Sequence, residues 1–289
     1  MKVFLNNTIE DKAIDRIADA LRKYIPEGME LVQSEDEAEL VIIYAFGLRR
    51  GVKHHTERLL KAGKKYAIVQ ICIRNTPNPK TEDWLPIWQK AQLVWSYFDL
   101  NRYCVEDGNL GNFNFYFAPL GVNSEIFQQT GELKDYIVAS SGHGFSRESM
   151  REIVLAAREV NRRVFHIGQA MEVGRDIDYS NGMSDADLAK SLSRCSFVAG
   201  LRRTEGFELP VIEGLLCGAR PICFDKPHYR TWFASLPEYI PEGTDEEVIQ
   251  SLVKIFKEPV RPVTKDEKDY VKAFFNWKAV AEGFWRKLI

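Results

Sequence analysis

The sequence has no long hydrophobic run, no marked charge excess and no ordered set of cysteines. No stretch approaches the run of about 18 apolar residues that suggests a bilayer-spanning helix, so we expect no transmembrane segment. The 39 basic and 41 acidic residues nearly balance, so net charge does not point to nucleic acid or a membrane surface. The five cysteines show neither metal-ligand spacing nor a disulfide framework, which predicts reduced core residues in a cytoplasmic protein.

A dinucleotide fingerprint is also missing, because no G-x-G-x-x-G turn follows the first predicted strand, Val3 to Leu5. What the chain does have is alternation of helical patterns with short apolar runs such as Tyr66 to Ile73. A continuous apolar run of this length is typical of a parallel strand buried on both faces. We therefore predict an α/β fold built on open, mainly parallel sheets.

Residues 202–224 carry the strongest local pattern. The pattern predicts a polar loop, a short helix with Pro210 in its first turn, a stop at Gly218 and a buried strand. The helix is apolar on nearly every side, which indicates burial. Glu213 nevertheless lies within it, and a buried carboxylate needs hydrogen-bond donors or a proton.

The start of this helix suits an anion. Free backbone N–H groups and the positive end of the helix dipole gather there and favour phosphate. Glu205 and Glu213 lie on either side of that position in the sequence, and carboxylates accept hydrogen bonds from hydroxyl groups. A ligand with phosphate between two sets of hydroxyls is a nucleotide sugar.

The segment Glu205-Gly206-Phe207-Glu208-Leu209-Pro210-Val211-Ile212-Glu213 resembles the E-x7-E signature, E-G-F-G-L-P-x-x-E, of the retaining glycosyltransferase family 4. The resemblance implies that Glu205 contacts the donor sugar and that Glu213 holds the ribose hydroxyls. It also implies that backbone N–H groups of Gly206, Phe207 and Leu209 face the donor. Glu208 departs from the signature, which has glycine there, so donor choice or pocket shape is expected to differ.

Two more segments resemble the same family. Leu120 to Phe127 is similar to its G-V-[ND]-x-x-x-F segment, and Phe275 to Trp285 to its closing F-[ST]-W-x-x-V/I-A-E segment. The resemblance implies a GT-B type fold, with two Rossmann-like domains facing across a cleft. Residues 1–122 would bind the acceptor, residues 135–274 would bind the nucleotide sugar, and residues 275–289 would form a helix returning to the N-terminal domain.

Several basic residues are candidates for the donor phosphates. Arg202 and Arg203 precede the motif, and a guanidinium can bind a diphosphate with two hydrogen bonds. The plainer interpretation is a surface pair, or an internal ion pair with Glu213. Glycines before a helix also suit phosphate, and the family has a G-R-L…K-G loop where this chain has Gly142 and His143. The remaining donor-site candidates are Gly142, Arg147, Glu208 and Lys226. The candidate catalytic residues are Glu205 and His143.

Residues 47–80 form a basic segment with nine Lys or Arg residues and one Glu. Such a run is usually a solvated face. The alternative is an anionic acceptor, namely a glycan, a phospholipid or a nucleic acid. The candidate acceptor-binding residues are Arg49, Arg50, Lys53, His54 and His55, of which the histidines could act as a base on the acceptor hydroxyl.

The resemblance implies transfer of a hexose-type sugar from a nucleotide-diphosphate sugar to an acceptor hydroxyl, with retention of anomeric configuration. Because no D-x-D motif lies near the proposed phosphate site, we expect no essential metal, and no cofactor besides the nucleotide-sugar co-substrate. Two alternatives stay open. One is a nucleotide-sugar epimerase or hydrolase on the same fold, and the other is a non-catalytic nucleotide- or nucleic-acid-binding module.

Overall fold

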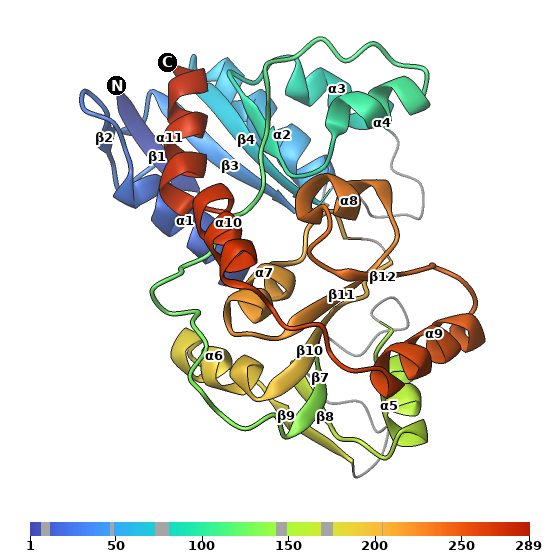
Figure 1. Ribbon diagram of the computed structural model, residues 1–289. Coiled ribbons are helices and arrows are strands. Elements are labelled where there is room, and N and C mark those ends of the chain that lie inside the picture. Colours follow the sequence, from blue (N-terminus) through green and yellow to red (C-terminus); the bar gives the residue numbers. More distant parts are fainter. Residues whose placement is uncertain (7–11, 47–48, 73–80, 143–148, 169–175, 204) are drawn as a thin grey trace. The chain divides into compact units, whose positions relative to one another are not determined.

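The computed structural model describes residues 1–6, 12–46, 49–72, 81–142, 149–168, 176–203 and 205–289. The chain divides into two compact units (Figure 1). The first comprises Met1–Leu120 and Trp277–Ile289, and the second Gly121–Asn276. Each unit contains its own six-stranded sheet.

The sheet of the first unit is parallel throughout, in the order β2-β1-β3-β4-β5-β6. Its middle strands, β3 and β4, are apolar and largely buried, as expected for parallel strands covered on both faces. The strands are β1 (Lys2–Asn6), β2 (Glu30–Leu31), β3 (Leu40–Phe46), β4 (Lys65–Cys72), β5 (Val94–Ser96) and β6 (Phe115–Phe117).

The last helix of the chain belongs to this first unit and packs against its first helix. Trp285 Nε1 donates a hydrogen bond to the carbonyl of Leu21 (3.2 Å), and the Tyr116 hydroxyl donates to the carbonyl of Val280 (3.0 Å). Both ends of the sequence therefore contribute to one core. The helices are α1 (Lys12–Lys23), α2 (Arg49–Lys61), α3 (Thr81–Trp88), α4 (Leu100–Glu106) and α11 (Trp277–Leu288).

The second unit has parallel strands in the order β12-β11-β10-β7-β8-β9. Counted from its first strand, β7, this is the doubly wound order 3-2-1-4-5-6 of Rossmann-like sheets, and the order reverses between β7 and β10. The strands are β7 (Tyr136–Gly142), β8 (Val164–Gly168), β9 (Ile177–Ser180), β10 (Cys195–Gly200), β11 (Arg220–Phe224) and β12 (Glu238–Ile240).

Helix starts in the second unit follow local capping chemistry. Ser184 caps α6 through its side chain, and Thr244 and Thr264 form capping boxes with glutamates of α9 and α10. In addition, α7 packs against β10 and β11, and α5 packs against α9. The helices are α5 (Met150–Glu159), α6 (Asp185–Ser193), α7 (Leu209–Leu216), α8 (Pro227–Phe233), α9 (Asp245–Lys257) and α10 (Lys265–Phe274).

The predicted α/β class with two Rossmann-like units is confirmed. The sequence pattern of residues 171–182 predicts no regular structure, but Ile177–Ser180 form the edge strand β9. These residues are polar and partly exposed, so they lack the apolar alternation that marks a strand. The elements α4 and β12 are also absent from the sequence-based prediction, because seven and three residues are too few to show a clear period.

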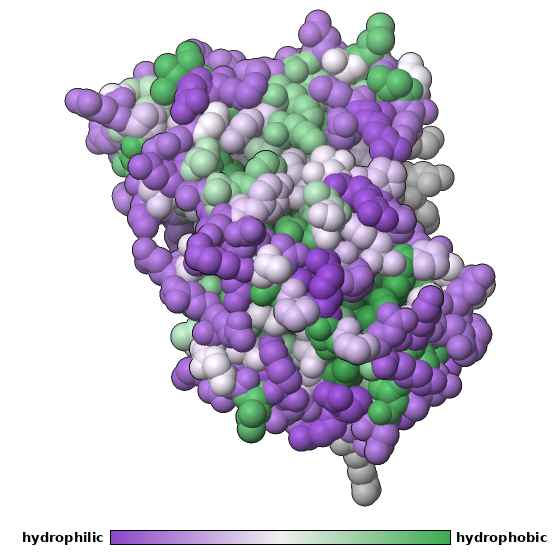
Figure 2. Space-filling model, in the orientation of Figure 1, coloured by the Kyte–Doolittle hydropathy of each residue, from purple (hydrophilic) through white to green (hydrophobic). Residues whose placement is uncertain are grey.

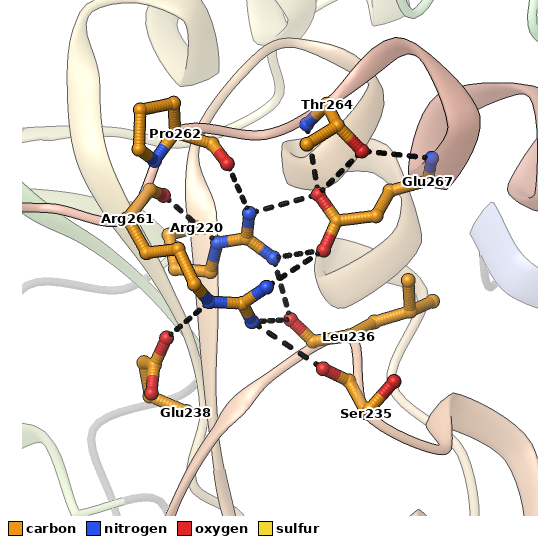
Figure 3. A network of polar contacts seen from close by, with 8 residues as sticks. All are labelled: Arg220, Ser235, Leu236, Glu238, Arg261, Pro262, Thr264 and Glu267. Carbon is orange, nitrogen blue, oxygen red and sulfur yellow. Dashed lines mark hydrogen bonds and ion pairs between the residues drawn. The ribbon is translucent and has the colours of Figure 1, made fainter.

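A buried cation joins the sheet of the second unit to α10 (Figure 3). Arg220, the first residue of β11, is fully buried, and its Nη1 and Nη2 donate to the two carboxylate oxygens of Glu267 at 2.7 and 2.9 Å. Glu267 also accepts the backbone N–H of Thr264 at 2.8 Å. The hydrogen bond from Arg220 is the main cause that lowers the pKa of Glu267 to about 2. Further acceptors of Arg220 are the carbonyls of Arg261, Leu236 and Pro262.

Figure 2 shows a face covered mostly by hydrophilic side chains, with smaller hydrophobic areas between them. No helix among the described residues combines the length and the apolar content that a bilayer crossing requires.

Candidate functional site

The loop between β10 and α7 lies at the carboxyl end of the second sheet, at its topological switch point. Strand β10 ends at Gly200 and the neighbouring β7 ends at Gly142. Because the strand order reverses here, right-handed crossovers carry the chain to opposite faces of the sheet. Open α/β sheets bind their ligands outside the carboxyl ends of such strands.

Two glycines allow α7 to lie close to the sheet (Figure 1). A Cβ atom at Gly214 would lie 2.5 Å from Cγ1 of Val198 in β10, and one at Gly200 would lie 2.5 Å from Cγ2 of Val211. The helix has Pro210 in its first turn and is followed by Gly218 with a φ of +83°, as the sequence predicts. Close packing therefore brings the start of α7 to the end of β10.

The three glutamates of the motif lie at different depths. The Glu205 side chain is 36% exposed, whereas Glu208 and Glu213 are 1% and 2% exposed. The burial predicted for Glu213 is thus confirmed. One carboxylate is accessible to a ligand before α7, and two are enclosed by protein at the start and in the middle of the helix.

The guanidinium of Arg202 lies between two of these carboxylates. Its Nη1 is 3.7 Å from Oε1 of Glu205, and its Nε is 3.7 Å from Oε2 of Glu208. The Tyr229 hydroxyl, on α8, is 3.3 Å from Oε1 of Glu208 and 3.0 Å from the carbonyl of Arg202. Burial and the Glu208 charge raise the pKa of Tyr229 well above its ordinary value, so the hydroxyl keeps its proton and remains a donor.

Arg203 and Lys226, both candidate phosphate-binding residues, contact a second acidic segment. Arg203 Nη1 donates to the carbonyl of Gly243 (3.2 Å), and its Nη2 lies 3.5 Å from Asp245. Lys226 Nζ lies 2.7 Å from Glu242 and donates to the carbonyl of Arg203 at 2.6 Å. The two cations therefore hold residues 242–245 beside the loop that follows β10, and a diphosphate would compete with these carboxylates.

Tyr229 and the acidic partners of Arg203 were not among the residues predicted from the sequence. Glu152 of α5 was not predicted either; it is 4% exposed, and its pKa is raised mainly by burial and further by its neighbour Asp245. Glu152 and Asp245 lie on α5 and α9, far apart in sequence, so no local spacing could have paired them. Tyr229 carried one local signal, since it belongs to an aromatic helix directly after a buried strand.

The end of β7 also comes close to a neighbouring strand. Gly142 and Gly168 have φ values of 144° and 130°, and a Cβ on Gly168 would lie 2.0 Å from the carbonyl oxygen of Gly142. Only glycine accommodates this approach. The candidates His143 and Arg147 lie outside the described residues.

In the first unit, His55 lies at the carboxyl edge of the sheet. Its Nε2 is 2.6 Å from Oε2 of Glu35, and its Nδ1 is 3.4 Å from Nδ2 of Asn6, the last residue of β1. Both ring nitrogens thus have protein neighbours, so His55 needs a rearrangement before it can act on an acceptor hydroxyl. Among the other candidates of this segment, Lys53 and His54 are exposed on α2, and Arg49 and Arg50 begin α2 with side chains outside the described part.

Within the described ranges, no group of three or more His, Cys, Asp or Glu side chains is placed to hold a metal ion.

No protein-family model and no curated protein matches the chain. Its fold is similar to that of HepE from Anabaena in complex with UDP-glucose, with a TM-score of 0.77 and 11% identity over 99% of this chain and 98% of that chain. It is also similar to sucrose-phosphate synthase from Thermosynechococcus elongatus, with a TM-score of 0.70 and 13% identity over 86% of this chain and 72% of that chain. A third similar structure is AviGT4, a glycosyltransferase involved in avilamycin A biosynthesis, with a TM-score of 0.63 and 10% identity over 99% and 96% of the two chains. At such low identity the likeness shows a shared fold, that of GT-B glycosyltransferases.

Proposed function

We propose that this protein transfers a sugar from a nucleotide-diphosphate sugar to an acceptor hydroxyl, with retention of anomeric configuration. The observation that carries the proposal is the position of Glu205 and Glu213. The accessible and the buried carboxylate of one motif bracket the start of α7 at the switch point of a Rossmann-like sheet. A nucleotide sugar presents hydroxyls on both sides of its diphosphate, which suits this arrangement.

In this proposal, Glu205 contacts hydroxyls of the donor sugar and Glu213 accepts hydrogen bonds from the ribose. Backbone N–H groups at the start of α7 face the diphosphate and stabilise its charge as it leaves. A uridine diphosphate sugar is the first donor to test. HepE, whose structure matches over nearly the whole length of both chains, was solved in complex with UDP-glucose. We also propose that no metal is needed, so that chelation by EDTA leaves turnover unchanged.

The acceptor belongs to the same proposal. The basic residues of α2 and of the flanking loops suit an anionic acceptor, and Lys53 and His54 are exposed there. His55 contacts Glu35 and Asn6 at the carboxyl edge of the first sheet.

Thermal denaturation with a panel of UDP-, GDP-, dTDP- and ADP-sugars tests the donor assignment. A ligand at about 100 times its Kd stabilises the folded state by about 2.7 kcal/mol, which corresponds to a rise in Tm on the order of 5–10 °C for a protein of this size. We expect such a rise with at least one nucleotide sugar, reduced by Glu213→Ala. No response to any member of the panel would contradict the proposal.

Diphosphate release and product NMR then separate the possible reactions. Release that requires an acceptor, with the anomeric configuration kept in the product, is expected. Donor turnover that does not depend on an acceptor would instead indicate a hydrolase or epimerase. Binding without turnover would indicate a non-catalytic nucleotide-binding module.

A further inference from the structure

Glu208 stands at the start of α7 but does not cap it. The residue occupies the N-cap position, with φ −121° and ψ 100°, and its side chain makes no capping hydrogen bond. Short Ser, Thr, Asp or Asn side chains usually serve there, because their oxygens reach the first free N–H groups. The Glu208 carboxylate is instead 1% exposed, and a buried charge requires other compensating groups.

Two groups face this carboxylate. Arg202 Nε lies 3.7 Å from one oxygen, and the Tyr229 hydroxyl lies 3.3 Å from the other. Gly200 of β10 lies next to the Glu208 side chain. A Cβ at Gly200 would lie 3.6 Å from the Cβ of Glu208 and 2.9 Å from Sγ of Cys223, so the absence of a side chain there leaves room for Glu208. The carboxylate therefore occupies an enclosed position with a cation on one side and a hydroxyl on the other.

Arg202 connects this buried carboxylate to the accessible one. Its Nε faces Glu208, while its Nη1 lies 3.7 Å from Glu205. A guanidinium is planar and permanently charged, so the directions of its N–H groups are fixed relative to one another. Holding Arg202 at its buried side consequently restricts where the Glu205 carboxylate can lie.

We propose that Glu208 is a positioning residue, which acts through Arg202 to orient Glu205 toward the sugar of the donor. The inference rests on the proposed function, in which Glu205 contacts the sugar and Glu213 the ribose. In this role, Glu208 orients the donor-binding carboxylate from the position where the E-x7-E pattern has glycine. Glu208 itself is not assigned a contact with the donor, because its carboxylate faces Arg202 and Tyr229.

Isothermal titration calorimetry with UDP-glucose and with UDP separates the sugar side of the site from the nucleotide side. If another nucleotide sugar binds more tightly, it and its nucleoside diphosphate replace this pair. We expect Glu208→Gln to raise the Kd for the nucleotide sugar about tenfold. This is the effect of losing one hydrogen bond to a charged group, here the bond between the sugar and Glu205. The Kd for the free nucleotide should change by less than about twofold, because UDP lacks the sugar that Glu205 contacts in the proposed function.

Further variants separate positioning from folding. Tyr229→Phe keeps the ring and removes only the hydroxyl. Like Glu208→Gln, it should raise the ratio of the Kd for UDP-glucose to the Kd for UDP. Adding Glu208→Gln to Arg202→Gln should cause no further change in that ratio, because both changes interrupt one chain of contacts. The matched control is Glu267→Gln, which removes a carboxylate that is paired with a buried arginine and lies outside the motif. It should lower Tm and leave the ratio unaltered.

Each outcome has a definite meaning. Equal weakening of nucleotide and nucleotide sugar by Glu208→Gln, an unchanged ratio, or additive losses in the double variant would each overturn the positioning role while leaving the proposed function intact. A wild-type protein that binds no nucleotide sugar would overturn the proposed function and the positioning role together.

Discussion

Arg220 and Glu267 form a two-point ion pair in which a fully buried guanidinium meets a carboxylate that is only 15% exposed. The pair joins the first residue of β11 to the first turn of α10. Since α7 packs on β11, the contact also supports the strand behind the candidate site.

This pair predicts a loss of stability in acid. The pKa of Glu267 falls from its ordinary 4.5 to about 2 in the folded state, so its contribution is complete above 4.5 and disappears as the pH falls through about 2. We expect the free energy of unfolding to decrease by about 3 kcal/mol over this window from Glu267 alone. Urea denaturation at a series of pH values measures the decrease. Glu267→Gln should flatten it, and an equally steep decrease in that variant would count against the assignment.

Two glycines should respond in opposite directions to alanine. Gly214→Ala places a methyl group against Val198 and should destabilise the protein by about 1–3 kcal/mol through overpacking. Gly51 lies within α2 with no atom near a Cβ position, so Gly51→Ala should stabilise by about 0.5–1 kcal/mol through helix propensity. Chemical denaturation of both variants tests this pair. A neutral Gly214→Ala would mean that α7 can move away from β10 without loss.

The motif carboxylates should have separable effects on the donor. Glu213→Gln is expected to weaken UDP and UDP-glucose alike, by about tenfold, because both carry the ribose. Glu205→Gln is expected to weaken only the nucleotide sugar and to lower the rate of transfer. Calorimetry and diphosphate release measure the two effects. If Glu213→Gln affected the nucleotide sugar alone, the two roles would have to be exchanged.

The basic segment of α2 should matter for an anionic acceptor. We expect the triple variant Arg49→Ala, Arg50→Ala, Lys53→Ala to bind the anionic acceptor more weakly. The loss should be largest at low salt, and the affinity should depend less on salt concentration than in the wild type. Fluorescence anisotropy with an oligonucleotide, a sulfated glycan and anionic lipid vesicles as separate probes measures the change. Arg102→Ala, on an exposed arginine of the same unit paired with Glu106, is the control. Equal binding by triple variant and control would leave α2 as a solvated face.

The start and end of α7 could be predicted from local chemistry. Pro210 is compatible with a first turn and Gly218 accepts the positive φ after the last, and the apolar residues between them required burial. By contrast, β9 could not be predicted, because its polar residues become a strand only through pairing with β8. Edge strands of this kind carry little pattern of their own.

The sequence by itself determined the α/β class, the order of most elements and the two carboxylates on either side of the start of α7, because these follow from short-range periodicity, capping and spacing. Only the tertiary structure decided how the charges around the motif are shared. Arg202 lies between Glu205 and Glu208, while Arg203 and Lys226 face the acidic residues 242–245. Such partners come from separate loops and helices, and parallel pairing of distant strands brings them together.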